Sequence, residues 1–259
     1  MFIIECLPLT KSLNKESLSY FSSKYFEGGS LIKVPLRKKV VSALVLESRE
    51  VMESKSEIKS ASFSMKKVGS KIENMDSKPF LRKEFLEATK ETSEFFVSSH
   101  GAILDQIIPS FFLENQKILQ SKNKKNPTVI SGAKSEVSII QTDNEERISH
   151  YKSITREEFA RKKSVFICLP QNEQIKQIKE KLEKGIEQFT VFFHKDMKKN
   201  ELSSEIKKVL NSDHPVLVIA TAKWLFLPRF DLGTIIIEKE NSGGWKTLNR
   251  PFIDIRYFA

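Results

Sequence analysis

The sequence from Pro215 to Glu238 reads PVLVIATAKWLFLPRFDLGTIIIE. It contains two short, continuous apolar runs, PVLVIAT and GTIIIE, with Pro228 between them. Runs that do not alternate with polar residues are typical of strands buried on both faces of a parallel sheet. This stretch therefore predicts two neighbouring strands of such a sheet.

The same pattern extends upstream through the second half of the chain. Further strand-like runs are TVIS, VSII, SVFICLP and FTVFF, at residues 128–131, 137–140, 164–170 and 189–193. Amphipathic helix-like stretches lie between them: REEFARK, EQIKQIKEKLEKG and LSSEIKKVLN, at residues 156–162, 173–185 and 202–211. Buried strands that alternate with helices predict an α/β fold with a parallel sheet, RecA-like or Rossmann-like.

The first half has a different pattern. Short apolar runs at residues 2–9, 31–36 and 40–46, with a turn signal at 27–30, predict a small antiparallel β unit. The Ser/Lys-rich residues 54–77 predict an irregular excursion. Helical spacing then predicts a helix over 81–95 and a second one over 101–108, which Pro109 ends.

The charged segment QSKNKKNP, residues 120–127, lacks apolar residues and predicts a linker. We therefore expect a β-rich domain over 1–119 and a parallel-sheet domain over 128–259.

Composition limits the function classes. The 259 residues carry a formal net charge of +10, which favours an anionic partner such as nucleic acid, although a solvated lysine-rich surface explains the same charge. No stretch is long and apolar enough to span a membrane, and no signal peptide is indicated, so we expect a cytoplasmic protein without a membrane partner. Cys6 and Cys168 lie far apart without a Cys/His cluster, so we expect no zinc site.

The C-terminal segment carries a family resemblance. Residues 219–241, IATAKWLFLPRFDLGTIIIEKEN, resemble the segment IGTRSALFLPFKNLGLIIVDEEH of the primosomal protein N′ (PriA) replication-restart helicase family. RPFIDIRYFA at 250–259 looks like the family's PRYHARDVA. In the first half, GSLIKVPLRKKVVSALVL at 29–46 looks like GCRVRVPFGKQxxRIGIVV, and FFVSSHGAILDQIIP at 95–109 looks like YYHHPIGDVLFHALP.

The resemblance implies a module that holds the 3′ end of a DNA strand, followed by the first lobe of an ATP-dependent helicase. Single-stranded or forked DNA is the implied partner, with single-strand-binding or primosome proteins as further expected partners. ATP and Mg²⁺ would be the cofactors only if the nucleotide site were still functional.

The nucleotide site departs from the family pattern. The phosphate-binding loop GVTGSGKT falls on residues 141–148, QTDNEERI, where its glycines, Lys and Thr are all replaced. Arg147 retains a cation, but Asp143 and Glu145 stand where phosphates would bind, and each opposes a phosphate charge by roughly 3 kcal/mol. We therefore predict that ATPase activity is lost and that no cofactor is bound.

The magnesium-binding motif DEEH likewise becomes residues 238–241, EKEN. Glu238 and Glu240 are the remaining carboxylates of this degenerate site, and they are otherwise simply polar residues at a strand end.

Two groups of residues are the candidates for DNA contacts. The first is Tyr20 with the basic residues around Pro35: Lys33, Arg37, Lys38 and Lys39. The second is Trp245 and Lys246, since the family's aromatic-rich neighbourhood contacts single-stranded DNA. A solvated basic turn and a packing role for Trp245 are the alternatives. The family's FDY tripeptide is Leu18-Ser19-Tyr20 here, so the acceptor for a terminal nucleotide is missing.

The sequence therefore predicts a DNA-binding protein related to replication restart, with helicase activity lost. The alternatives are a non-catalytic scaffold and a fragment of a longer ATP-dependent 3′–5′ DNA helicase.

Overall fold

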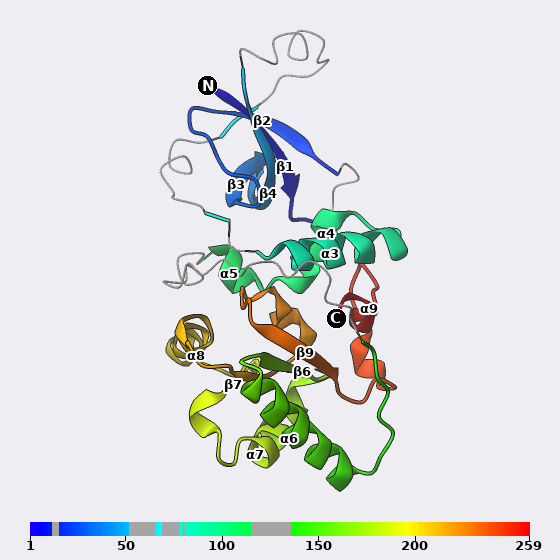
Figure 1. The fold of residues 1–259 in the computed structure, drawn as a ribbon. Helices are drawn as coiled ribbons and strands as arrows, with labels where there is room; N and C mark the ends of the chain where they lie inside the picture. The colour runs from blue at the N-terminus through cyan, green and yellow to red at the C-terminus, as the bar shows by residue number, and fades with distance from the viewer. Residues whose placement is uncertain (12–15, 52–65, 69–77, 80, 115–135) are drawn as a thin grey trace. The chain divides into compact units, whose positions relative to one another are not determined.

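A computed structural model describes residues 1–11, 16–51, 66–68, 78–79, 81–114 and 136–259 (Figure 1). The chain divides into two compact units, one formed by Met1–Gln120 with Lys246–Phe258 and the other by Ser121–Trp245 with Ala259. The expected linker at 120–127 lies outside the described residues, so the domain boundaries stay a prediction. The first unit is built on a mixed sheet and the second on a parallel sheet, which confirms the predicted fold class.

The sheet of the first unit has the strand order β3-β4-β1-β2-β5. The strands are β1 Phe2–Pro8, β2 Leu18–Ser22, β3 Leu31–Leu36, β4 Lys39–Glu50 and β5 Lys66–Lys67. All neighbouring pairs are antiparallel except β2 and β5. Ile4 and Cys6 of β1 are buried while Glu5 between them points to the other face, as the pleat of a strand requires.

This sheet is curled. The hydroxyl of Tyr20 on β2 donates to the carbonyl oxygen of Pro35 on β3 at 3.1 Å. The ammonium of Lys66 on β5 donates to the carbonyl oxygen of Arg37, just after β3, at 3.4 Å. Since β3 and β5 stand at opposite ends of the strand order, these bonds require the sheet to bend until its two ends meet.

Four helices complete the described part of the first unit: α3 Lys83–Phe95, α4 His100–Ile107, α5 Ser110–Glu114 and α9 Ile255–Phe258. The two predicted helices correspond to α3 and α4. Gly101 lets α4 approach β1 closely, because a Cβ atom there would lie 2.2 Å from the carbonyl oxygen of Pro8. A larger residue at this position would push α4 off the sheet.

The parallel sheet of the second unit has the strand order β7-β8-β6-β9. Its strands are β6 Ser164–Cys168, β7 Thr190–Phe192, β8 Leu217–Ala220 and β9 Leu232–Ile237, and its main helices are α6 Asn144–Ala160, α7 Ile175–Leu182 and α8 Lys199–Asn211. Short 3-10 helices are η2 Asn172–Gln174, η3 Glu187–Phe189, η4 Ala222–Phe226 and η5 Gly243–Trp245. All residues of β6 and β8 are buried, as their continuous apolar sequences predict.

One strand prediction is wrong. Residues 137–140, VSII, form no strand, and the side chains of Val137 and Ile139 are 89% and 90% exposed. The apolar pattern is that of a strand, but a strand exists only beside a neighbour, and the described residues supply none here. The TVIS run lies outside the described residues.

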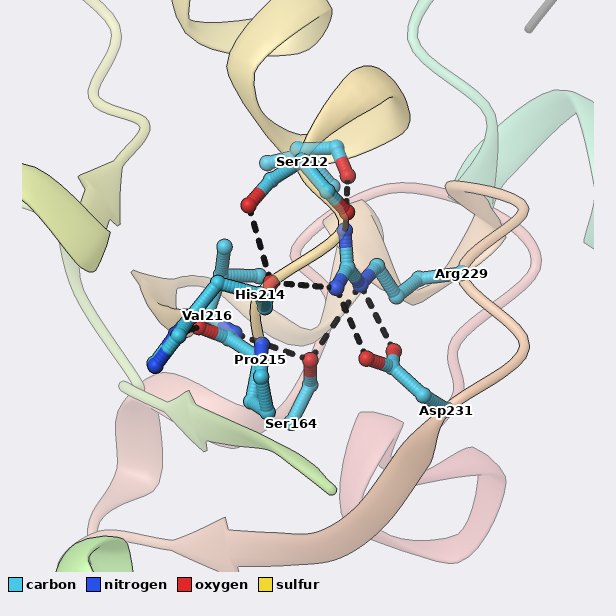
Figure 2. Close-up of polar contacts among 8 residues, drawn as sticks. Ser164, Ser212, His214, Pro215, Val216, Arg229 and Asp231 are labelled. Atoms are coloured by element: carbon cyan, nitrogen blue, oxygen red, sulfur yellow. Dashed lines mark hydrogen bonds and ion pairs between the residues drawn. The ribbon is translucent and has the colours of Figure 1, made fainter. Parts of the chain in front are cut away.

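Arg229 ties together the amino-terminal ends of three strands (Figure 2). Its guanidinium donates to the carbonyl oxygens of Val209 and Ser212, at the end of α8, and of His214. It also donates to both carboxylate oxygens of Asp231, just before β9, and to the hydroxyl of Ser164, the first residue of β6. That hydroxyl in turn accepts from the backbone N–H of Val216, just before β8.

His100 makes the stability of the first unit depend on pH. Burial, reinforced by the nearby charge of Lys90, lowers the pKa of His100 from its ordinary 6.5 to about 4. Between these pH values the unfolded chain binds a proton that the folded chain does not, so stability falls as the pH falls, by at most about 3 kcal/mol. In thermal unfolding of His100→Asn between pH 7 and pH 4, we expect a smaller decrease in melting temperature than in the wild type.

The exposed His150 offers the matched control. His150→Asn should keep the wild-type pH dependence. An unchanged pH dependence in His100→Asn would contradict the assignment.

Candidate functional site

Three exposed cations of the first unit follow one another at the turn between β3 and β4. Arg37, Lys38 and Lys39 are all exposed, and Arg37 adopts a left-handed backbone conformation with φ of 53°. Lys33 lies on β3 opposite Ser42 of β4 and is partly exposed. The predicted basic residues around Pro35 therefore share one hairpin.

The curl of the sheet adds a cation that the sequence analysis missed. Lys66 pairs with Tyr20 across β5 and β2, and its ammonium lies 3.4 Å from the carbonyl oxygen of Arg37. Neighbouring Lys67 is exposed as well. Lys66 is 29 residues from Arg37, so no pattern of local spacing could have joined them. We call Arg37, Lys38, Lys39 and Lys66 the basic turn.

Tyr20 lies beneath this surface and not on it. Its ring is 3% exposed and belongs to the apolar core of the curled sheet. Its hydroxyl is bound to Pro35, and burial raises its pKa to about 12. Tyr20 thus positions the strand that leads into the basic turn, and its ring has no open face for a base.

Trp245 and Lys246 differ in their surroundings. Trp245 is 1% exposed, and its indole N–H donates to the carbonyl oxygen of Lys239 at 2.9 Å. This burial argues against base stacking and for the packing role that the sequence had left open. Lys246 is exposed and forms an isolated backbone bridge with Asp254.

The loop after Lys246 is held by its own hydrogen bonds. The hydroxyl of Thr247 donates to the carbonyl oxygen of Pro251 at 2.8 Å and accepts from the N–H of Ile253 at 2.8 Å. Arg250 and Phe252 are exposed within this loop. An aromatic ring beside cations is what single-stranded nucleic acid stacks on, so Phe252 replaces Trp245 as the candidate there.

Residues 141–148, at the expected phosphate loop, instead make an ordinary helix start. Asp143 is the N-cap of α6, and its Oδ1 accepts from the backbone N–H groups of Glu145 and Glu146 at 2.8 and 2.9 Å. A phosphate at a helix N-terminus would use such N–H groups, and here a carboxylate already occupies them. The exposed Glu145 adds a second negative charge to this turn.

The two motifs meet in a buried ion pair. Arg147 Nε donates to Oε2 of Glu238 at 3.1 Å, and Arg147 Nη2 lies 3.1 Å from Oε1 of the same carboxylate. The hydroxyl of Tyr151 donates to Oε2 of Glu238 at 2.6 Å. Glu238 is 1% exposed, so its charge is neutralised inside the protein.

Tyr151 is a second residue of the candidate site that the sequence analysis missed. Burial, followed by the hydrogen bond to Glu238, raises the pKa of Tyr151. A signal did exist, because Tyr151 follows Arg147 by four residues and so lies on the same face of α6. The partner 87 residues away had no such signal.

A small pocket of about 130 Å³ adjoins the ion pair. Its lining includes Arg147, Glu238 and Lys239, together with Gln177 and Lys181 of α7. Ligand pockets for drug-sized molecules measure about 300–1,000 Å³, so this pocket is small for a nucleotide. Glu240, the remaining carboxylate of the second motif, does not line it and is exposed.

The residues at the positions of the two motifs do not fit Mg²⁺ and a nucleoside triphosphate. The Arg147 charge is engaged by Glu238, the Glu238 carboxylate is engaged by Arg147 and Tyr151, and the N–H groups of Glu145 and Glu146 are capped.

Comparison with known proteins supports the family resemblance. No protein-family model matches the chain. Two curated proteins similar to it are the replication restart proteins PriA of Helicobacter pylori strains J99 and 26695. Each is 22% identical over 251 residues, which cover 92% of this chain. The chain spans 37% of the length of these relatives. The likeness relates it to the replication-restart proteins.

No described helix is long and apolar enough to cross a membrane.

The ion pair predicts a large effect of a single substitution. Arg147→Met leaves the Glu238 charge buried without its cation, which costs roughly 3–5 kcal/mol of unfolding free energy. Urea unfolding should show this loss, and adding Glu238→Gln to Arg147→Met should recover part of it.

Arg156 is exposed on the same helix and provides the matched control. Arg156→Met should change the unfolding free energy by less than about 0.5 kcal/mol. Equal losses in the two single variants would show that the pair does not stabilise this fold.

Proposed function

We propose that this protein binds single-stranded or forked DNA in replication restart and does not hydrolyse ATP. DNA binding rests on the basic turn, where the cations come from a hairpin and from a strand brought beside it by the curl of the sheet. The loss of ATP hydrolysis rests on the buried contact between Arg147 and Glu238.

The basic turn has the properties of a phosphate-binding surface. Its cations are mostly exposed, and Lys66 lies against the carbonyl oxygen of Arg37. No described acidic residue forms an ion pair with Arg37, Lys38, Lys39 or Lys66. Lys and Arg that contact phosphates release condensed counterions, which makes binding steeply dependent on salt.

End specificity is not part of this proposal. Ser19 stands where the related family has an aspartate, and the ring of Tyr20 is buried. The remaining contacts are to phosphates, which every nucleotide carries, so we expect binding along a strand and not only at its 3′ end.

Removing three of these cations should weaken DNA binding strongly. For Lys38→Ala, Lys39→Ala and Lys66→Ala combined, the slope of log K against log salt should become less steep by about 2 with single-stranded DNA. The same relation predicts about a hundredfold weaker binding at 0.1 M salt if all three residues contact phosphates. Fluorescence anisotropy of a labelled oligonucleotide and of a labelled fork, over a range of salt concentrations, measures both quantities.

The control removes the same charge from the second unit. Lys176, Lys184 and Lys207 are exposed there, and their triple alanine variant should bind DNA nearly as the wild type does. If the two triple variants bound DNA equally weakly, the loss of affinity would reflect net charge alone, and the proposal would be wrong.

The chain should not bind ATP with useful affinity. Both charges of the site neutralise each other, so a phosphate chain would have to break a buried ion pair before it could bind. Titration with a fluorescent ATP analogue should give a Kd weaker than about 1 mM, or about −4 kcal/mol, with or without Mg²⁺. Tight, Mg²⁺-dependent binding, or phosphate release stimulated by forked DNA, would contradict this half of the proposal.

A non-catalytic scaffold is the second candidate. The rings of Phe95 and Tyr257 stack with their centroids 4.2 Å apart, and both side chains are exposed. Val97 beside them is exposed and adopts a left-handed backbone conformation with φ of 49°, which is uncommon for a β-branched residue. An exposed apolar cluster of this kind favours a protein partner over phosphate.

A third candidate is that the chain acts as part of a longer helicase. It matches 37% of the length of its relatives, and a nucleotide cleft formed with further polypeptide would then be tested only in that longer protein.

A further inference from the structure

The outer edge of β7 is covered by side chains of α8. β7 lies at one end of the strand order and pairs with β8 alone among the described strands. The helix α8 follows β7 in the chain and packs beside it (Figure 1). Edge strands carry unpaired N–H and C=O groups on which another chain can add a strand, and charged side chains often protect them. The sequence of β7, TVF, has no charge of its own, so such protection has to come from another element.

The alternation of a strand decides which backbone groups of β7 point outward. The N–H of Phe193, directly after the strand, donates to the carbonyl oxygen of Ile219 on β8 at 3.2 Å. Every second residue of a strand directs its backbone groups to the same neighbour. Val191 therefore faces β8 as Phe193 does, whereas the backbone groups of Thr190 and Phe192 point away from the sheet.

Lys208 and Glu205 of α8 bind two of these outward groups. The ammonium of Lys208 donates to the carbonyl oxygen of Thr190 at 2.8 Å, and to that of Glu187, before the strand, at 3.3 Å. The backbone N–H of Phe192 donates to the carboxylate of Glu205. An acceptor and a donor that a further strand would use are thus occupied by a cation and a carboxylate, three positions apart on one helix.

The carboxylate of Glu205 is held at this edge although its burial is unfavourable. Its side chain is partly buried, and its Oε2 has no hydrogen-bond partner among the described residues. Burial raises the pKa of Glu205. The charge of Lys208, the N–H of Phe192 and the charge of Lys179 on α7 act in the opposite direction. The contacts at the β7 edge therefore offset part of the cost of burying this carboxylate.

A second copy of this chain is the strand source that the edge itself supplies. Two identical edges related by a twofold axis run antiparallel, so each offers the other the same donors and acceptors. The residues of β7 are β-branched or aromatic, and such residues favour strand pairing. The exposed backbone groups of β7 would therefore suit a symmetric pair of chains if α8 did not occupy them.

We propose that Glu205 and Lys208 block the β7 edge and thereby prevent two copies of this chain from pairing through it. A strand of a second copy would have to displace both side chains from the backbone groups that they bind. This inference does not depend on the proposed DNA binding, since the basic turn belongs to the other unit.

Removing both side chains should cause self-association. Glu205→Leu combined with Lys208→Met frees the outward groups of β7, keeps residues that favour a helix and leaves the net charge unchanged. In sedimentation velocity, the double variant of the full chain should form dimers at concentrations at least about tenfold below those at which the wild type does, if the wild type forms them at all.

Ser204 and Lys207 provide the matched control, because both are exposed on the same helix. Ser204→Leu combined with Lys207→Met adds the same two apolar side chains on its solvent side and should associate no more than the wild type does. Equal association in the two double variants would overturn the proposal. A folded Glu205→Leu, Lys208→Met variant that associates no more than the wild type would overturn it as well.

Hydrogen exchange at Phe192 tests the same contact even if the double variant does not fold. Glu205→Gln keeps an oxygen that can accept from the N–H of Phe192, whereas Glu205→Leu has none. In dilute protein, the Phe192 amide should exchange several-fold faster in Glu205→Leu than in Glu205→Gln. Amides of the central strand β6 should exchange alike in both variants and report any general loss of stability. Equal exchange at Phe192 would show that Glu205 does not occupy the edge.

Discussion

The guanidinium of Arg229 is the contact on which the parallel sheet depends. It is 12% exposed, and its donors reach the end of α8, the carboxylate before β9 and the first residue of β6. Most of these polar groups are partly buried and Ser164 is 1% exposed, and a buried polar group without a partner costs free energy. Because one planar cation satisfies them together, three strands start from fixed positions, and their carboxyl ends are fixed as a consequence.

A second arginine, Arg147, acts at the other end of the same sheet, where the strands have their carboxyl ends. Arg147 and Tyr151 from α6 engage the carboxylate of Glu238, which β9 delivers to this end. The family resemblance implies that a cation and a carboxylate at these aligned positions would serve phosphate and Mg²⁺. In this protein Arg147 and Glu238 bind each other, so the two charges that would bind a ligand instead hold α6 on the sheet. Stability and ligand binding compete for one pair of residues, which is why we propose that hydrolysis is lost.

In the first unit, the cations are brought together by the shape of the sheet and not by pairing with a carboxylate. The basic turn needs a curled sheet, because only the curl brings Lys66 of β5 beside Arg37. The buried hydroxyl of Tyr20 supports the same geometry through Pro35. Tyr20, which the sequence suggests as a DNA contact, therefore supports the strand that leads into the basic turn. The cations of the basic turn are exposed, whereas Arg147 of the second unit is paired with Glu238 inside the protein. An anionic partner could therefore reach the first group but not the second.

Local sequence patterns are enough to predict the continuous apolar strands and the amphipathic helices, because burial on both faces of a strand or along one stripe of a helix leaves a periodic signal. The sequence also placed the basic residues around Pro35 on a strand and the turn that follows it, and it shows that residues 141–148 contain no glycine. It could not decide whether residues 137–140 form a strand, because a strand requires a neighbour that the local pattern does not specify. Three features appear only in the folded chain: Trp245 is buried, Lys66 joins the basic turn, and Glu238 meets Arg147 and Tyr151. Each of these depends on contacts between residues far apart in the chain, and their geometry arises only when the sheets are assembled.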